Sequence, residues 1–187
     1  MCSEQPFADC AGFRLQPFAA DSLTAGLELT VSAVRRSSSL LLRYELRGRL
    51  EDVLLPEPEQ AATPSRRHQL WQQTCFELFI APAGQPQYWE INLAPSGDWN
   101  VYAFSACREG MREEQAVTAL PCQTERQPDA LTLEFAVPAI IAAARPAEAA
   151  ACAVIQRRTG QKSFWALRHC GQQPDFHRRA SFCLSLR

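Results

Sequence analysis

The segment from Trp71 to Arg108 constrains the fold most strongly, because three short runs within it alternate apolar and other side chains. Two of the runs read CFELFI and QYWEIN, and the third begins at Trp99. A period of two is typical of strands that pack one face in a core. We therefore predict three consecutive antiparallel strands joined by two turns. The core-facing residues expected on the first two strands are Phe76, Leu78, Ile80, Trp89, Ile91 and Leu93.

The first turn determines which residues face each other across these strands. A four-residue loop, Pro82 to Gln85, would place Glu77 directly opposite Glu90. Like charges that face each other on a sheet destabilise it by up to about 1 kcal/mol. A chain that keeps this pair is expected to hold a cation, a shared proton or a polar ligand beside it. The pattern therefore predicts a binding face without specifying what is bound.

The second turn, APSGD, pairs Leu93 with Trp99 and extends this face to the third strand. The face is then expected to carry Glu77, Phe79, Tyr88, Glu90, Asn92, Asn100, Tyr102 and Phe104. Carboxylates and amides beside aromatic rings suit a sugar, since they bind hydroxyl groups while the rings contact its apolar side. An alternative is a second buried face, covered by the proline-rich loop or by the C-terminal hairpin. Its glutamates would then be neutralised by Arg108 or Arg168.

The rest of the chain also has the character of an all-β protein. One short helix is expected from Pro138 to Arg145, where a proline precedes a run rich in alanine. Strands separated by turn signals favour a β-sandwich of roughly eight to ten strands over an α/β fold. Residues 1–187 are expected to form one domain. The further predicted strands are 26–34, 40–48, 116–120, 131–137, 152–158, 163–168 and 181–186.

Composition limits the partners that such a domain can have. The chain has 19 Lys and Arg against 20 Asp and Glu, a net charge of -1, which argues against binding to nucleic acid or an anionic membrane. No apolar run approaches membrane-spanning length, and the beginning MCSEQPFADC lacks the pattern of an export signal. The eight cysteines are irregularly spaced, without a C-x-x-C pair. We therefore expect reduced thiols and a cytoplasmic protein.

Two longer stretches carry a resemblance to a known family. RRHQLWQQTCFELFIAPAGQPQYWEINLAPSGDWNVYAFSACREGM and FWALRHCGQQPDFHRRASFCLSL resemble the bacterial DOMON-like domain family, which is related to family-nine carbohydrate-binding modules. The resemblance covers roughly residues 60–112 and 130–187. It implies an antiparallel β-sandwich, DOMON-like or jelly-roll-like, that binds a small ligand such as a sugar or haem. With the short helix expected above, this is our prediction for the fold.

The resemblance also implies roles for individual residues. Trp71 stands where the sugar-binding modules place one wall of an aromatic clamp, and Glu77 occupies the carboxylate position of the following strand. The second aromatic wall lies near the C-terminus in that family, where Trp165 and Phe176 are the candidates here. The alternative for Trp71 is a tryptophan buried at the entrance of a strand.

The three histidines occupy different contexts. His68 lies in a polar, basic loop and is expected to be exposed to solvent. His169 and His177 flank the turn GQQPD, so they could approach each other or bracket a ligand. Asp175 and His177 could form a hydrogen-bonded pair that orients the imidazole. We favour the alternative, in which these polar side chains hold the turn in place.

Two other functions stay open at this point. Haem would need two axial ligands, and Met111 with His169 or His177 is the combination that the sequence offers. Without a C-x-x-C-H motif, such haem would be non-covalent. An enzyme is the other possibility, since carboxylates about 5 Å apart are typical of retaining glycosidases. Neighbouring positions on a hairpin are more typical of binding, and no catalytic motif is present.

The prediction from sequence is thus a domain that binds a small polar ligand, carbohydrate-like, on one sheet face. Non-covalent haem binding and a scaffold without ligand are the alternatives. We predict no catalytic or metal-binding residue and no cofactor, since neither haem nor calcium has a supporting motif. The predicted ligand-binding residues are Trp71, Glu77, Glu90, Asn92, Asn100, Tyr102, Arg108, Trp165 and His177.

Overall fold

The computed structural model describes residues 5–6, 12–36, 39–56, 63–144 and 146–186. Within them run 13 strands, one α-helix and three short 3-10 helices. The strands are β1 (Gln5–Pro6), β2 (Gly12–Pro17), β3 (Leu27–Arg36), β4 (Ser39–Gly48), β5 (Cys75–Pro82), β6 (Tyr88–Leu93), β7 (Trp99–Phe104), β8 (Arg112–Glu113), β9 (Cys122–Gln127), β10 (Ala130–Ala136), β11 (Ala147–Gln156), β12 (Lys162–Ala166) and β13 (Leu184–Leu186). The helices are η1 (Leu50–Asp52), η2 (Leu70–Gln72), α1 (Ala139–Ala142) and η3 (Arg179–Ser181).

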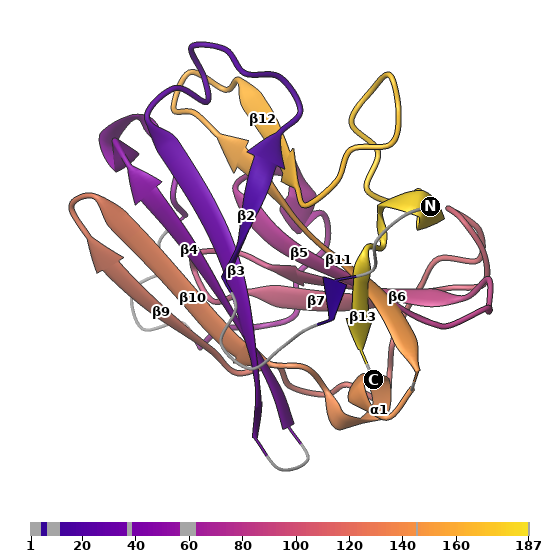
Figure 1. Ribbon diagram of the computed structural model, residues 1–187. Helices are drawn as coiled ribbons and strands as arrows, with labels where there is room; N and C mark the ends of the chain where they lie inside the picture. Colours follow the sequence, from indigo (N-terminus) through magenta and orange to yellow (C-terminus); the bar gives the residue numbers. More distant parts are fainter. Residues whose placement is uncertain (1–4, 7–11, 37–38, 57–62, 145, 187) are drawn as a thin grey trace.

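The strands form one continuous sheet that curls until its two halves face each other (Figure 1). Their order is β8-β7-β6-β5-β11-β12-β2-β3-β4-β10-β9, and β13 adds to β11. All pairings are antiparallel except that of β1 with β13. The predicted all-β sandwich with one short helix is therefore confirmed.

The main core lies between the two halves of the curled sheet. Leu29, Leu133 and other residues from one half pack there with Ile91 and residues from the other half. The rings of Tyr44 on β4 and Phe76 on β5 lie 5.4 Å apart, and the Tyr44 hydroxyl donates to the backbone carbonyl of Glu77 at 2.7 Å. This bond ties β4 to β5 across the core and so helps to hold the backbone of Glu77 in place.

One predicted strand, 116–120, does not form. This part of the chain turns instead, since the Ala116 amide donates to the Glu114 carboxylate at 3.1 Å and the Val117 amide to the Glu114 carbonyl at 3.3 Å. Val117 and Leu120 are nevertheless buried in the main core. Their apolar character reflects the packing of a loop rather than a strand, and β9 begins only at Cys122.

The register of the first predicted hairpin was wrong by two residues. Glu77 lies opposite Asn92, and Glu90 lies opposite Phe79. The connection between β5 and β6 is longer than four residues, with a turn closed by the Gln85 amide and the Pro82 carbonyl at 3.2 Å. A shift by two keeps every side chain on its predicted face. The register predicted for β6 and β7 is confirmed, with Leu93 opposite Trp99.

The three predicted half-buried strands are in fact buried on both faces. A second apolar cluster lies on the outer face of β5, β6, β7, β11 and β12, away from the main core. The segment 167–183, yellow in Figure 1, folds back over this face. Phe176 and Phe182 from that segment pack against Phe79 with ring centroids 6.5 and 5.9 Å apart. The covering segment therefore comes from the C-terminal region, as the alternative interpretation expected.

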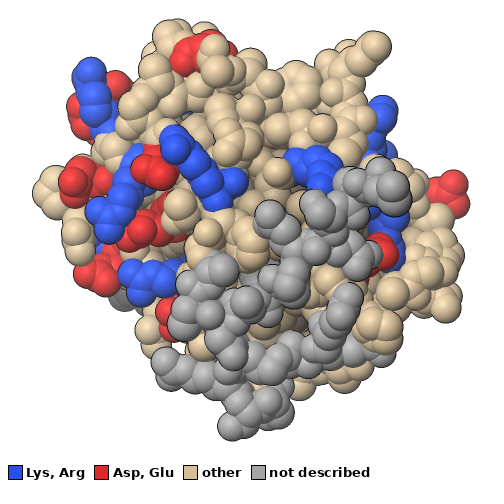
Figure 2. All heavy atoms as spheres, in the orientation of Figure 1, with Lys and Arg blue, Asp and Glu red and all other residues tan. Residues whose placement is uncertain are grey.

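The visible surface shows no accumulation of one charge. In Figure 2, basic and acidic side chains are interspersed on the left of the view. Exposed ion pairs also join charges of opposite sign, such as Arg47–Glu45 at 2.8 Å and Arg14–Glu28 at 3.7 Å. No helix in the described part of the chain is long and apolar enough to cross a membrane.

Candidate ligand-binding site

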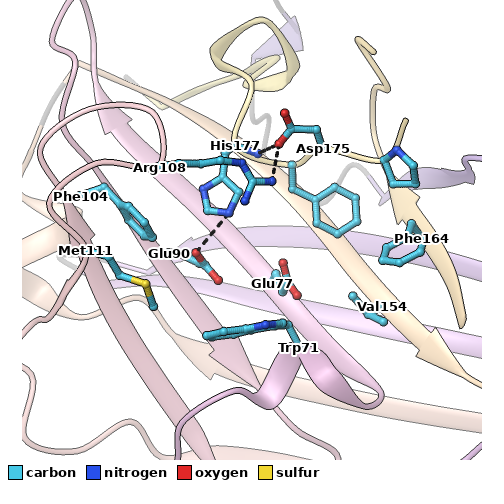
Figure 3. A pocket seen from close by; sticks show the side chains of 12 residues that line it. Trp71, Glu77, Glu90, Phe104, Arg108, Met111, Val154, Phe164, Asp175 and His177 are labelled. Atoms are coloured by element: carbon cyan, nitrogen blue, oxygen red, sulfur yellow. Dashed lines mark hydrogen bonds and ion pairs between the residues drawn. The ribbon is translucent and has the colours of Figure 1, made fainter. Parts of the chain in front are cut away.

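A cavity of about 320 Å³ remains between the outer sheet face and the covering segment. Its floor comes from β5 and β6, and its far wall comes from β11, β12 and the covering segment. Figure 3 shows the two glutamates at its base, with Trp71 on one side and His177 on the other. The residues that line it are Trp71, Glu77, Glu90, Phe104, Arg108, Met111, Val154, Phe164, Pro174, Asp175, Phe176 and His177.

Glu77 is the least satisfied polar group of this cavity. The residue is only 3% exposed, and its Oε1 has no hydrogen-bond partner. Burial raises the pKa of Glu77 well above its ordinary value, and the nearby charge of Glu90 raises it further. A buried acceptor without a donor costs about 1–3 kcal/mol. The fold keeps Glu77 at this cost, which is what a site built for a hydrogen-bonding ligand requires.

Glu90 is better supported by its neighbours. Its Oε1 accepts a hydrogen bond from Asn92 Nδ2 at 2.7 Å, and its Oε2 lies 3.8 Å from His177 Nε2. Burial raises the pKa of Glu90 to about 7, although the Asn92 hydrogen bond and the positive charge of Arg108 act in the opposite direction. Near neutral pH this carboxyl group can therefore gain or lose a proton easily.

His177 completes the polar part of the cavity. Burial lowers the pKa of His177 to about 4, with a further lowering by Arg108 that Asp175 opposes, so the imidazole is neutral at pH 7. Its Nδ1 lies 2.8 Å from the Tyr88 hydroxyl, which accepts the Arg108 backbone N–H at 3.1 Å. This arrangement fits a tautomer in which Nδ1 accepts from Tyr88 and the ring proton sits on Nε2, facing Glu90.

The covering segment is tied down beside the cavity by Asp175. Its Oδ1 accepts from the Arg108 guanidinium at 2.8 Å and from the His177 backbone N–H at 3.2 Å. The second bond is the turn-holding role favoured from the sequence. His177 itself points into the cavity and contacts Phe79 and Phe104 edge-on, with centroids 5.2 and 5.3 Å apart. Asp175 thus holds the turn, and His177 faces the site.

Apolar side chains form the walls. Trp71 lies on η2 with its ring 5.7 Å from that of Tyr102. Phe104 stacks on Tyr88 with centroids 4.7 Å apart, and Phe164 meets Phe176 edge-on at 6.2 Å. A space with carboxyl groups at its base and rings at its sides can bind a small molecule that has both polar groups and an apolar surface.

Five of the nine residues predicted to bind ligand line this one cavity: Trp71, Glu77, Glu90, Arg108 and His177. Asn92 lies directly beside it, where its amide supports Glu90. The site predicted from the sequence thus joins residues that lie up to about a hundred positions apart in the chain. It missed Val154 and Phe164, which are apolar positions on strands, and Pro174, which lies in the polar turn GQQPD.

Asn100 and Tyr102 do not reach the cavity. Asn100 accepts from the Arg66 guanidinium at 2.8 Å and donates to the Arg67 carbonyl at 2.9 Å and to the Tyr102 hydroxyl at 3.0 Å. Both side chains therefore anchor the loop that leads into η2 and so position Trp71. His68 is exposed, as predicted, and its Nδ1 lies 3.3 Å from the Tyr102 hydroxyl.

The placement of Trp165 corrects the prediction for the second aromatic wall. Trp165 is 2% exposed and lies in the main core, where its indole N–H donates to Ser163 Oγ at 2.9 Å. Side chains alternate along β12, so Phe164 points to the outer face instead and lines the cavity. Phe176, the other candidate, lies there too. Both faces of β12 are apolar, so the sequence could not distinguish them.

His169 does not line the cavity that contains His177. Its Nε2 bonds to the backbone carbonyl of Gln16 on β2 at 2.9 Å, and its ring meets Phe18 edge-on at 5.2 Å. Of the haem ligands considered, Met111 and His177 line the same cavity. His177 Nε2 already faces Glu90, however. Among the described residues, no group of three or more His, Cys, Asp and Glu could hold a metal ion.

Comparison with known proteins supports the fold. No protein-family model matches the chain, and no curated protein matches its sequence. Among solved structures, it is similar to a proposed carbohydrate-binding protein from Bacteroides uniformis, with a TM-score of 0.64 and 15% identity over 94% of this chain and 85% of that chain. At this identity the similarity shows a shared β-sandwich fold. The resemblance to the DOMON-like family stays a prediction.

Weaker similarities involve a family 9 carbohydrate-binding module from Caldicellulosiruptor kristjanssonii. Its complex with cellotriose has a TM-score of 0.49 and 10% identity over 84% of this chain and 72% of that chain. Its complex with glucose has a TM-score of 0.44 and 10% identity over 81% and 70%. These values are too low to support an argument about this chain.

Proposed function

We propose that this protein binds a small, carbohydrate-like ligand in the cavity between Trp71 and His177. The observation that carries the proposal is the buried carboxyl oxygen Oε1 of Glu77, which has no partner and lies in a cavity walled by aromatic rings. A sugar offers both hydroxyl donors for such an oxygen and an apolar ring face for Trp71. The fold shared with a proposed carbohydrate-binding protein agrees with this function.

The cavity size agrees with a ligand of one or two sugar rings. Its volume of about 320 Å³ lies at the lower end of the range for small-molecule sites. Glu90, held by Asn92, and the guanidinium of Arg108 provide further polar groups in the cavity. Asn100 and Tyr102 have an indirect role, because they hold the loop that carries Trp71.

The proposal is tested by isothermal titration calorimetry with a panel of monosaccharides and disaccharides. We expect at least one sugar to bind, and Trp71→Ala to weaken its binding at least about tenfold, because the ring contact is lost. Ile140, which is 50% exposed and does not line the cavity, provides the control variant Ile140→Ala. Unchanged affinity in Trp71→Ala, with the fold intact by circular dichroism, would contradict this site.

Haem binding is a second candidate, because Met111 and His177 line the same cavity. Against it, His177 Nε2 faces Glu90 at 3.8 Å and His177 Nδ1 contacts Tyr88. Haem would therefore require the imidazole to give up one of these contacts, so that the freed ring nitrogen could coordinate the iron. Titration with hemin distinguishes the two functions: haem binding would shift and sharpen the Soret band of hemin, a change that is lost in Met111→Ala, whereas the carbohydrate proposal expects no such change.

A further inference from the structure

The two buried glutamates of the cavity have no Lys or Arg paired with them in the described part of the chain. Glu77 and Glu90 are 3% and 4% exposed, and both line the cavity. Among the described residues, no ion pair joins a Lys or Arg to either of them. Arg108, which lines the cavity, forms its ion pair with Asp175 at 2.8 Å. Two buried acids thus share one cavity without a fixed partner of opposite charge.

The remaining basic side chain in the cavity does not supply that charge. His177 lies 3.8 Å from Glu90, but its burial favours the neutral imidazole at pH 7. Asn92 donates one neutral hydrogen bond to Glu90 and leaves Glu77 Oε1 without a donor. Every influence on the ionisation of Glu77, burial first and then Glu90, disfavours its charged form. A cation entering the cavity would oppose both effects, because its positive charge favours the ionised form of Glu77.

The walls are also suited to a cation. Trp71 lies next to Glu77 in Figure 3, and Phe104 stands on the side of Glu90. Aromatic faces attract an ammonium group through their quadrupole, and this attraction is strongest in a desolvated site. A neutral sugar would contact the rings equally well but would offer the two acids no group of opposite charge.

We propose that the ligand of this cavity carries a protonated amine, as an amino sugar does, and that its ammonium group donates a hydrogen bond to Glu77 Oε1 and lies beside Glu90. This inference rests on the proposed function and specifies its ligand class. Entry of the ammonium group makes the carboxylates more acidic, so the protons held by Glu77 and Glu90 in the free protein are released to solvent.

The amine preference is tested by calorimetry with glucosamine, N-acetylglucosamine, glucose and ethanolamine at about pH 7, where Glu90 still holds part of its proton. Glucose matches the amino sugar in size without its charge, and N-acetylglucosamine keeps the nitrogen but carries it as a larger, neutral amide. We expect glucosamine to bind at least about tenfold more tightly than the two neutral sugars. Repeating the titration in buffers of different ionisation enthalpy should show proton release with glucosamine and none with glucose.

Variants locate the effect. Glu77→Gln should reduce the preference for glucosamine over glucose to about twofold or less, because the amide cannot accept an ammonium group as a charged partner. Glu134→Gln is the matched control, since Glu134 lies on β10 in the other half of the sheet. It should leave the preference unchanged. Circular dichroism establishes that both variants are folded.

The outcomes separate this inference from the proposed function. Glucose or N-acetylglucosamine binding as tightly as glucosamine would overturn the amine inference and leave carbohydrate binding in place. Binding of ethanolamine and glucosamine, with no neutral sugar bound at any accessible concentration, would support the amine and contradict a general carbohydrate site. Binding of none of the four compounds would overturn both.

Discussion

The same burial moves the pKa values of two adjacent residues in opposite directions. Burial disfavours any charged form, so it raises the pKa of the Glu90 carboxyl group to about 7 and lowers the pKa of the His177 imidazole to about 4. Their side chains lie 3.8 Å apart. At neutral pH the pair is thus a neutral imidazole beside a carboxyl group that is partly protonated, rather than a salt bridge.

The pKa of Glu90 gives the stability of the free protein a definite pH dependence. Between its ordinary value of 4.5 and about 7, the folded protein holds a proton that the unfolded chain has lost. The free energy of unfolding attributable to Glu90 is therefore largest below pH 4.5 and falls as the pH rises to about 7. We expect a loss on the order of 1 kcal/mol per pH unit in wild type relative to Glu90→Gln.

Urea unfolding of the two proteins at a series of pH values measures this difference. His177 acts in the opposite sense, because stability falls as the pH drops from 6.5 through about 4. It is present in both proteins, so its effect largely cancels in the comparison. A difference between wild type and Glu90→Gln that does not change with pH would show that Glu90 titrates normally.

At the scale of single elements, the turns decide how accurately the sequence can be interpreted. Between β6 and β7 the turn is tight. The Gly97 amide donates to the Ala94 carbonyl at 2.9 Å, and the Ala94 amide donates to the backbone carbonyl of Asp98 at 2.8 Å. Its Pro-Ser-Gly-Asp signature fixed the register correctly. The β5–β6 connection also contains turn residues, Pro82, Gly84 and Pro86, but they do not fix how many residues it leaves unpaired. A slip of two residues there leaves the alternation unchanged, so periodicity alone could not detect it.

Two glycines with a positive φ provide a prediction at this scale. Gly48 ends β4 with φ +124°, and a Cβ atom there would lie 1.9 Å from the Gly26 carbonyl oxygen. Gly84 also has a positive φ, +72°, but no atom lies within 4 Å of its Cβ position. We expect Gly48→Ala to lower the free energy of unfolding by more than about 3 kcal/mol, and Gly84→Ala by only about 1 kcal/mol. Chemical denaturation of both variants measures the difference, and equal losses would contradict this account of Gly48.

At the scale of the whole molecule, the site depends on a contact that no local pattern reveals. Glu77 and Glu90 could be assigned to one face by alternation, and Trp71 by resemblance. Phe164, Phe176 and the exact partners of His177 depend on how the segment 167–183 folds back over that face. This return sets the depth of the cavity and the burial that shifts the pKa values. Such long-range packing has no signature in neighbouring residues.

The central claim is that the cavity beside Trp71 and Glu77 holds a ligand. A crystal structure of the protein soaked with the tightest-binding sugar or amino sugar tests it most directly. We predict a ligand whose ring lies against the Trp71 indole and whose hydroxyl or ammonium group lies within hydrogen-bond distance of Glu77 Oε1. Density for the ligand outside this cavity, with Glu77 Oε1 still without a partner, would contradict the claim.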